Sequence, residues 1–153
     1  MRAWLSAFLF ATFLLVPATS HAGDVEITHA VFGIFNPPAA GAPGFTPTTT
    51  VPLVPGQTYG WIMTVKTTQP SVHWREEFTL PAAAPWGGQA DPQASTSVSA
   101  DKTTSVTEMD QPIGRVPIIF HGWSVAAGDP KGHYKIRVIV DGTLEQVFEF
   151  DVQ

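Results

Sequence analysis

The chain has 153 residues and no cysteine, and its 8 lysines and arginines against 13 aspartates and glutamates give a formal net charge of −5. This acidic balance argues against nucleic acid as a partner and against anionic membrane surfaces, because both require a basic patch. The absence of cysteine excludes disulfides, thiol catalysis, thiolate zinc sites and iron–sulfur ligation. We therefore expect no nucleic-acid partner and no cofactor.

The N-terminus has the pattern of a secretion signal. Arg2 precedes residues 3–16, a run with no charged residue, and a short polar segment follows. Small residues at Ser20 and Ala22 favour cleavage after Ala22, so that the mature chain starts at Gly23. The alternative is a retained membrane anchor. A helix needs about 20 apolar residues to cross a bilayer, however, and this run has only 14.

Cleavage at this point leaves residues 23–153, enough for one domain with its own core. Its net charge is −6, because 7 basic and 13 acidic residues remain once Arg2 is lost. We expect no lipid anchor, because a lipoprotein signal ends at the cysteine that carries the lipid and this chain has none. We expect a periplasmic or secreted domain whose mature chain does not insert into the membrane.

Residues rich in Val, Ile, Thr and aromatic side chains, bounded by Pro, Gly and Asp, predict strands. The predicted strands are residues 25–35, 48–53, 57–67, 72–80, 96–99, 103–109, 117–125, 132–140 and 144–152. Pro52 marks residues 48–53 as an edge strand, since proline cannot donate to a sheet ladder. Turns every 8 to 12 residues without a long helix predict an all-β fold, an immunoglobulin-like antiparallel β-sandwich of about seven to nine strands.

The register of the last hairpin follows from its alternation. A two-residue turn would set the core residue Val138 opposite the surface residue Glu145, because a one-residue slip exchanges the faces of a strand. We therefore predict a three-residue loop at residues 141–143, or a bulge, with Val140 paired to Leu144. This register pairs Ile136 with Phe148 and Tyr134 with Phe150 in the core, and Lys135 with Glu149 and His133 with Asp151 outside.

Two segments, residues 36–47 and 81–102, resist interpretation as strands because they are rich in proline and glycine. Loops of this length are uncommon without a reason. Each is either a binding loop or a disordered insertion.

The sequence offers few candidate catalytic or metal-binding residues. The histidines at 29, 73, 121 and 133 show no compact ligand spacing, so we predict no metal site. No Gly-x-Ser-x-Gly elbow is present. The adjacent carboxylates Glu76 and Glu77 point to opposite faces of a strand and cannot converge on one bond. We predict no catalytic residue.

The tryptophans are the residues that say most about a possible binding site. Trp61 and Trp74 fall on the inward faces of their strands and are expected in the core. Trp86 lies in a Gly- and Pro-rich loop, and Trp123 follows His121 in a segment that is apolar on both faces. We predict Trp86, Trp123 and His121 as ligand-binding residues, because exposed aromatics stack on sugar rings or anchor protein partners.

Three blocks carry a family resemblance. They are residues 25–35 with Gly-Ile-Phe, residues 48–60 with Thr-Thr-Thr-Val-Pro and Gly-x-x-Tyr-Gly, and residues 132–152 with Gly-x-Tyr-x-Ile-x-Val-x-Val-Asp-Gly and Phe-x-Val. Together they resemble a bacterial family of exported β-sandwich domains of unknown function. The resemblance implies an immunoglobulin-like fold and export, and it implies no catalytic residue.

Three functions remain open. The first is a non-catalytic exported module that binds an envelope protein or a glycan, by analogy with other sandwiches. The second is a small hydrolase or metal-dependent enzyme using His73, His121 or His133 with Glu76 or Glu108. The third is part of an envelope assembly that pairs an edge strand with a partner.

Overall fold

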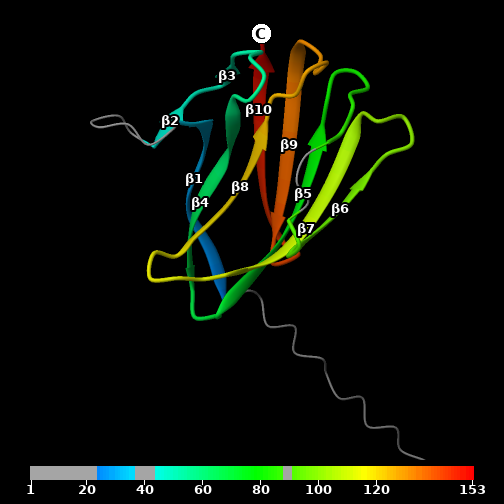
Figure 1. The fold of residues 1–153 in the computed structure, drawn as a ribbon. Coiled ribbons are helices and arrows are strands. Elements are labelled where there is room, and N and C mark those ends of the chain that lie inside the picture. The colour runs from blue at the N-terminus through cyan, green and yellow to red at the C-terminus, as the bar shows by residue number, and fades with distance from the viewer. Residues whose placement is uncertain (1–23, 37–43, 88–90) are drawn as a thin grey trace, which may run out of the picture.

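The computed structural model describes residues 24–36, 44–87 and 91–153 (Figure 1). In this part of the chain there are ten strands and no helix. The strands are β1 (Val25–Phe35), β2 (Phe45–Pro47), β3 (Thr50–Val51), β4 (Thr58–Thr67), β5 (Ser71–Thr79), β6 (Ala94–Val98), β7 (Thr104–Pro112), β8 (Ile118–Ser124), β9 (Gly132–Val140) and β10 (Leu144–Val152). Without a helix there is also no candidate membrane-spanning helix among these residues.

The described strands form two sheets that pack face to face. Sheet A has the order β2-β1-β4-β8, and sheet B has the order β3-β10-β9-β5-β7-β6. Neighbouring strands are antiparallel except for β3, which runs parallel to β10. The predicted β-sandwich class is confirmed.

The strand count exceeds the predicted seven to nine because one segment expected to be a loop ends in a short strand. The segment 36–47 ends in β2, which pairs with the end of β1. The predicted strand 96–99, within the segment 81–102, corresponds to β6, which forms one edge of sheet B. The predicted strand 48–53 shortens to β3, which lies at the opposite edge of sheet B, as the proline at its end requires. The predicted cleavage site at Ala22 and Gly23 lies outside the described residues.

The last hairpin has the predicted register. Val140 pairs with Leu144 and Val138 pairs with Gln146, so Glu145 lies opposite the outward residue Ile139. The three-residue loop between the strands contains two left-handed residues, at Asp141 (φ 51°) and Gly142 (φ 70°). All four further pairs that we predicted from the alternation of faces are present.

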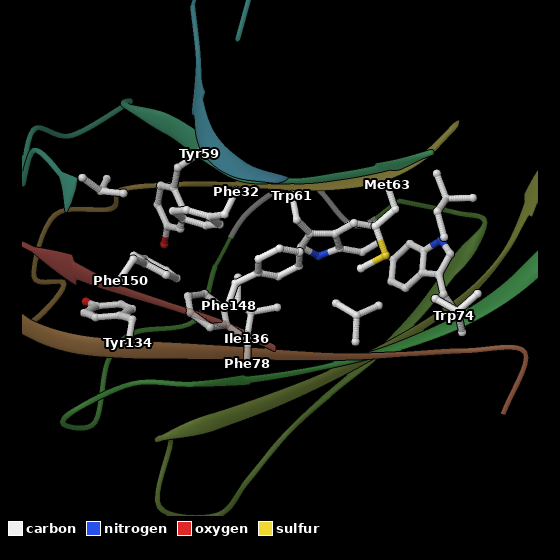
Figure 2. Close-up of a cluster of buried hydrophobic side chains, with 14 of the residues drawn as sticks. Phe32, Tyr59, Trp61, Met63, Trp74, Phe78, Tyr134, Ile136, Phe148 and Phe150 are labelled. Carbon is white, nitrogen blue, oxygen red and sulfur yellow. The ribbon is translucent and has the colours of Figure 1, made fainter. Parts of the chain in front are cut away.

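Aromatic rings fill the space between the sheets (Figure 2). Phe32 of β1 stacks on Phe150 of β10 with ring centroids 4.1 Å apart, which joins sheet A to sheet B. Tyr134 packs against Phe150 and donates its hydroxyl to the carbonyl of Pro130 at 2.6 Å. Such a bond from a strand tyrosine to backbone a few residues upstream is a feature of immunoglobulin-like sandwiches.

Candidate functional site

One carboxylate lies inside the core. Glu76 is 0 % exposed. It occupies the middle of β5, where Trp74 and Phe78 on either side also point inward. Because side chains two apart in a strand share a face, Glu76 must point into the sandwich with them. A buried carboxylate is costly unless hydrogen bonds satisfy it.

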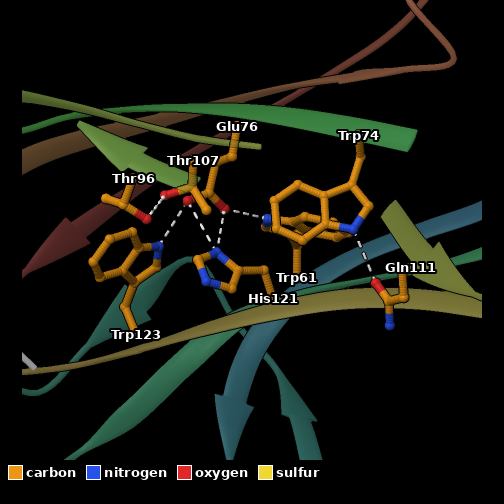
Figure 3. Close-up of polar contacts among 8 residues, drawn as sticks. All are labelled: Trp61, Trp74, Glu76, Thr96, Thr107, Gln111, His121 and Trp123. Atoms are coloured by element: carbon orange, nitrogen blue, oxygen red, sulfur yellow. Dashed lines mark hydrogen bonds and ion pairs between the residues drawn. The ribbon is translucent and has the colours of Figure 1, made fainter. Parts of the chain in front are cut away.

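Three donors surround Glu76 (Figure 3). Trp61 Nε1 donates to its Oε2 at 2.5 Å, and Trp123 Nε1 donates to its Oε1 at 2.8 Å. His121 Nδ1 lies 3.1 Å from both oxygens. These donors come from β4 and β8 of sheet A, whereas Glu76 belongs to sheet B. The contact is therefore a polar joint between the two sheets.

The donors reach one point because two similar tripeptides pair across sheet A. Residues 59–61 of β4 read Tyr-Gly-Trp and residues 121–123 of β8 read His-Gly-Trp. Their antiparallel register sets Trp61 opposite His121, the two glycines opposite each other, and Tyr59 opposite Trp123. The four ring side chains therefore share the inward face, directly above β5.

A third indole N–H, that of Trp74, is satisfied next to the Glu76 cluster. Trp74 Nε1 donates to Gln111 Oε1 at 2.9 Å, and the same oxygen accepts the backbone N–H of Phe120 at 3.2 Å. Trp74 also meets Trp61 edge to face, with ring centroids 5.3 Å apart. Among the described residues, Ser105 Oγ is the buried side-chain polar atom left without a partner.

The histidines at 73 and 133 lie apart from this cluster. His73 contacts Asp110 and His133 contacts Asp151, both at 3.0 Å. Within the described residues, no group of three or more histidines and carboxylates could hold a metal ion. The catalytic alternative thus obtains its pair, Glu76 with His121, but none of its other named residues joins them. In chemical terms, Glu76 holds the imidazole ring of His121 in one orientation.

The three predicted ligand-binding residues lie side by side. The ring centroids of Trp86 and Trp123 are 5.7 Å apart at an interplanar angle of 72°, and those of His121 and Trp123 are 5.2 Å apart. All three side chains are half-buried rather than exposed. Trp86 Nε1 donates to the carbonyl of Lys102 at 2.8 Å, which ties the loop after β5 to the turn before β7.

A small pocket of about 30 Å³ opens beside these indoles, and we call it the Trp86–Trp123 pocket. Its lining consists of Tyr59, Phe78, Leu80, Ala84, Pro85, Trp86, Gly87, Trp123, Ser124, Ala126 and Asp129. Trp86 and Trp123 both contact the ring of Phe78. The ligand-binding role of the three predicted residues stays a prediction.

The sequence pattern did not indicate two polar residues that line the pocket, Tyr59 and Asp129. Burial raises the pKa of the Tyr59 phenol far above its usual value, and the negative charge of Asp129 adds to this shift. Burial and the same carboxylate raise the pKa of Tyr134 to about 12. Both phenols are therefore neutral at physiological pH, and Asp129 supplies negative charge at this end of the sandwich.

No curated protein matches the chain. An immunoglobulin-like protein of known structure from Pseudomonas aeruginosa superposes with a TM-score of 0.57 at 18 % identity. The superposition covers 86 % of this chain and 98 % of that protein, so the likeness concerns the fold. A family model described as the PM0630 beta sandwich domain matches residues 30–153. The chain therefore belongs to the PM0630 beta sandwich domain family.

Proposed function

We propose that this chain is an exported, non-catalytic binding domain, and that it contacts a protein partner in the cell envelope through the Trp86–Trp123 pocket. The observation that carries the proposal is the meeting of Trp86, Trp123 and His121 at one end of the sandwich. Partly exposed tryptophans beside a pocket are typical anchors of protein interfaces.

The dimensions of the pocket favour a protein side chain over a glycan. A volume of about 30 Å³ holds about two water-sized groups, since one water needs about 10–15 Å³. A sugar ring does not enter such a space. The two indoles also meet at 72°, and this angle builds a corner instead of a flat stacking platform. A narrow corner accepts the tip of one side chain.

Export is supported by the N-terminal pattern described above. Cell fractionation of the natural host, followed by N-terminal sequencing, tests it directly. We expect the protein outside the cytoplasm with Gly23 as its first residue. Recovery of the uncleaved chain in the membrane fraction would contradict cleavage and favour the anchor.

Photo-crosslinking in the host tests the binding site. Gly87 lines the pocket, and a Cβ placed there meets nothing within 4 Å, so a benzoylphenylalanine at this position should leave the fold intact. Gly114 is the matched control, because a Cβ there also meets nothing and it lies in the connection before β8, at the other end of that strand.

We expect a discrete crosslinked protein from the Gly87 position and none from the Gly114 position. Equal products from both positions, or a product from Gly114 alone, would exclude the pocket as the contact site. A product from the Gly87 position that migrates as polysaccharide would replace the protein partner by a glycan.

A further inference from the structure

The floor of the Trp86–Trp123 pocket holds a polar group without a partner. Tyr59 is 2 % exposed and lines the pocket. None of the residues that the structure describes hydrogen-bonds its hydroxyl. Figure 2 shows the Tyr59 ring reaching from sheet A toward Phe150 of sheet B, with its oxygen at the far end. Unlike Ser105 Oγ, the hydroxyl oxygen is not fully enclosed, so in the pocket that Tyr59 lines it can accept a hydrogen bond from a bound group.

The carboxylate of Asp129 is another polar group in the lining of the pocket. Asp129 Oδ2 accepts the backbone N–H of Ala126 at 2.8 Å, which closes the turn after β8 and aims the carboxylate. In the described part of the chain, Asp129 makes no ion pair. Its other oxygen therefore has acceptor capacity left.

The walls of the pocket are aromatic and its lining carries no cationic side chain. Indole and phenol rings attract cations through the negative face of their π-systems. Nearby lysines do not occupy the site: Lys102 contributes its backbone carbonyl to Trp86, and neither Lys102 nor Lys131 lines the pocket. The chemistry of the pocket is thus complementary to a small positive group that donates hydrogen bonds.

We propose that the Trp86–Trp123 pocket binds a primary ammonium group, and that a lysine side chain of the protein partner supplies it. An ammonium is about the size of a water molecule and fits the pocket's volume. It donates to Asp129 and to the Tyr59 hydroxyl oxygen while its remaining surface lies against the indoles. This inference rests on the proposed function and names the chemistry of its partner.

The test uses the mature protein and defined probes. Indole N–H resonances of Trp86 and Trp123 are followed by NMR at constant ionic strength, during titration with N-acetyl-lysine methylamide and, separately, with n-butylammonium. We expect a saturable shift of the two resonances in the millimolar range with both probes. The Nε-acetylated lysine derivative and 1-butanol, which lack the charge, should produce no saturable shift.

Isosteric variants check the two polar contacts. Asp129→Asn keeps an oxygen for the Ala126 N–H and should weaken binding at least about 10-fold, while Tyr59→Phe should weaken it about 5-fold. Asp110→Asn is the matched control, because it removes an exposed carboxylate on the outer face of sheet B and should change nothing. Thermal unfolding of each variant establishes that it is folded.

Each outcome bears on the proposal. No saturable shift, an equal shift with the neutral probes, or full affinity in Asp129→Asn would mean that the pocket holds water only, and would overturn the ammonium site. Tighter binding of butylammonium than of the lysine probe would overturn a lysine as the source. A crosslink from Gly87 without ammonium binding would leave the binding function standing, whereas ammonium binding without a crosslink would remove the protein partner.

Discussion

Glu76 shows how a single buried charge is made tolerable. Removing a carboxylate from water costs several kcal/mol even after relaxation, and its partners must offset that cost. Three ring N–H groups do so here, two from indoles and one from an imidazole. Each indole would in turn lose its acceptor if the carboxylate were missing. Each member of the cluster therefore depends on the others for its hydrogen bonds.

Glu76→Gln should destabilise the fold by about 3 kcal/mol, because the amide offers one acceptor oxygen and sets its NH2 group against a donor. Glu77→Gln is the matched control on the opposite face of β5, where the carboxylate is 30 % exposed and pairs with Arg75 and Arg137. It should cost under about 1 kcal/mol. Urea unfolding measures both. Equal losses in the two variants would show that the buried cluster is not special.

Asp101 provides a pH test at the residue scale. Its carboxylate accepts hydrogen bonds from Ser99 Oγ and from the N–H and hydroxyl of Thr103, and these hold its pKa below the ordinary value, the Ser99 bond most of all. The folded pKa is below the unfolded one. Its stabilising contribution is therefore present above the unfolded pKa and is lost as pH falls through the folded pKa.

Carboxyl-carbon NMR should find the Asp101 midpoint below 3.8, and Ser99→Ala should move that midpoint upward. The variant removes the Ser99 donor to Asp101 and also the Oγ that accepts the backbone N–H of Thr104, and it should leave the paired strands in place. An unchanged midpoint in Ser99→Ala would mean that the side-chain hydrogen bond does not set the pKa.

At the scale of elements, the β4–β8 pair depends on glycines. Gly33, Gly60 and Gly122 form one row across β1, β4 and β8. The Cβ of an alanine at Gly60 would overlap the backbone carbonyl oxygen of His121. Close approach of these backbones is what lets the Tyr-Gly-Trp segment of β4 pair with the His-Gly-Trp segment of β8 above Glu76.

Gly60→Ala should cost about 2 kcal/mol or more, because backbone cannot give way as a flexible side chain can. Gly114→Ala, where the added methyl group meets nothing, should stay within about 0.5 kcal/mol of wild type. Chemical denaturation compares them, and indole NMR shifts report whether the Glu76 cluster is displaced. A neutral Gly60→Ala would contradict the close approach of β4 and β8.

At the scale of the whole molecule, the two outer faces differ. Sheet B carries a ladder of ion pairs, in which Arg137 binds Glu145 at 2.6 Å and Glu77 at 3.2 Å. Sheet A instead sets Val31, Ile62 and Phe120 in one row, beside the glycine row. Phe120 is 48 % exposed. Charge is thus confined largely to one side of the sandwich.

The two sheets are held together chiefly by buried rings, since the chain has no disulfide. Phe32→Ala should destabilise the protein by about 3–5 kcal/mol, because it removes the ring stacked on Phe150 and leaves a cavity between the sheets. Val54→Ala, at a side chain 57 % exposed, should change stability by less than about 0.5 kcal/mol. Calorimetry measures both, and a loss below about 1 kcal/mol for Phe32→Ala would show that the inter-sheet contact adapts.

Part of the site could be predicted from the sequence. The alternation that places Trp74 and Phe78 in the core also places Glu76 there, since it lies between them on the same face. The hydrogen-bond partners of Glu76 could not be predicted, because Trp61, His121 and Trp123 lie 15 to 47 residues away in the sequence and belong to the other sheet. Pocket residues such as Tyr59 and Asp129 are likewise separate in sequence and meet through packing.

The sequence by itself determined the all-β class, the bounds of the long strands to within three residues, and the register of the last hairpin. These follow from alternation and turn residues, which act within a few positions of one another. Only the tertiary structure decided which strands pair across sheet A, which side chains meet Glu76, and which aromatic rings enclose the pocket. The physical reason is that these contacts join distant segments through the packing of two sheets, and local patterns carry no information about which distant surfaces will face each other.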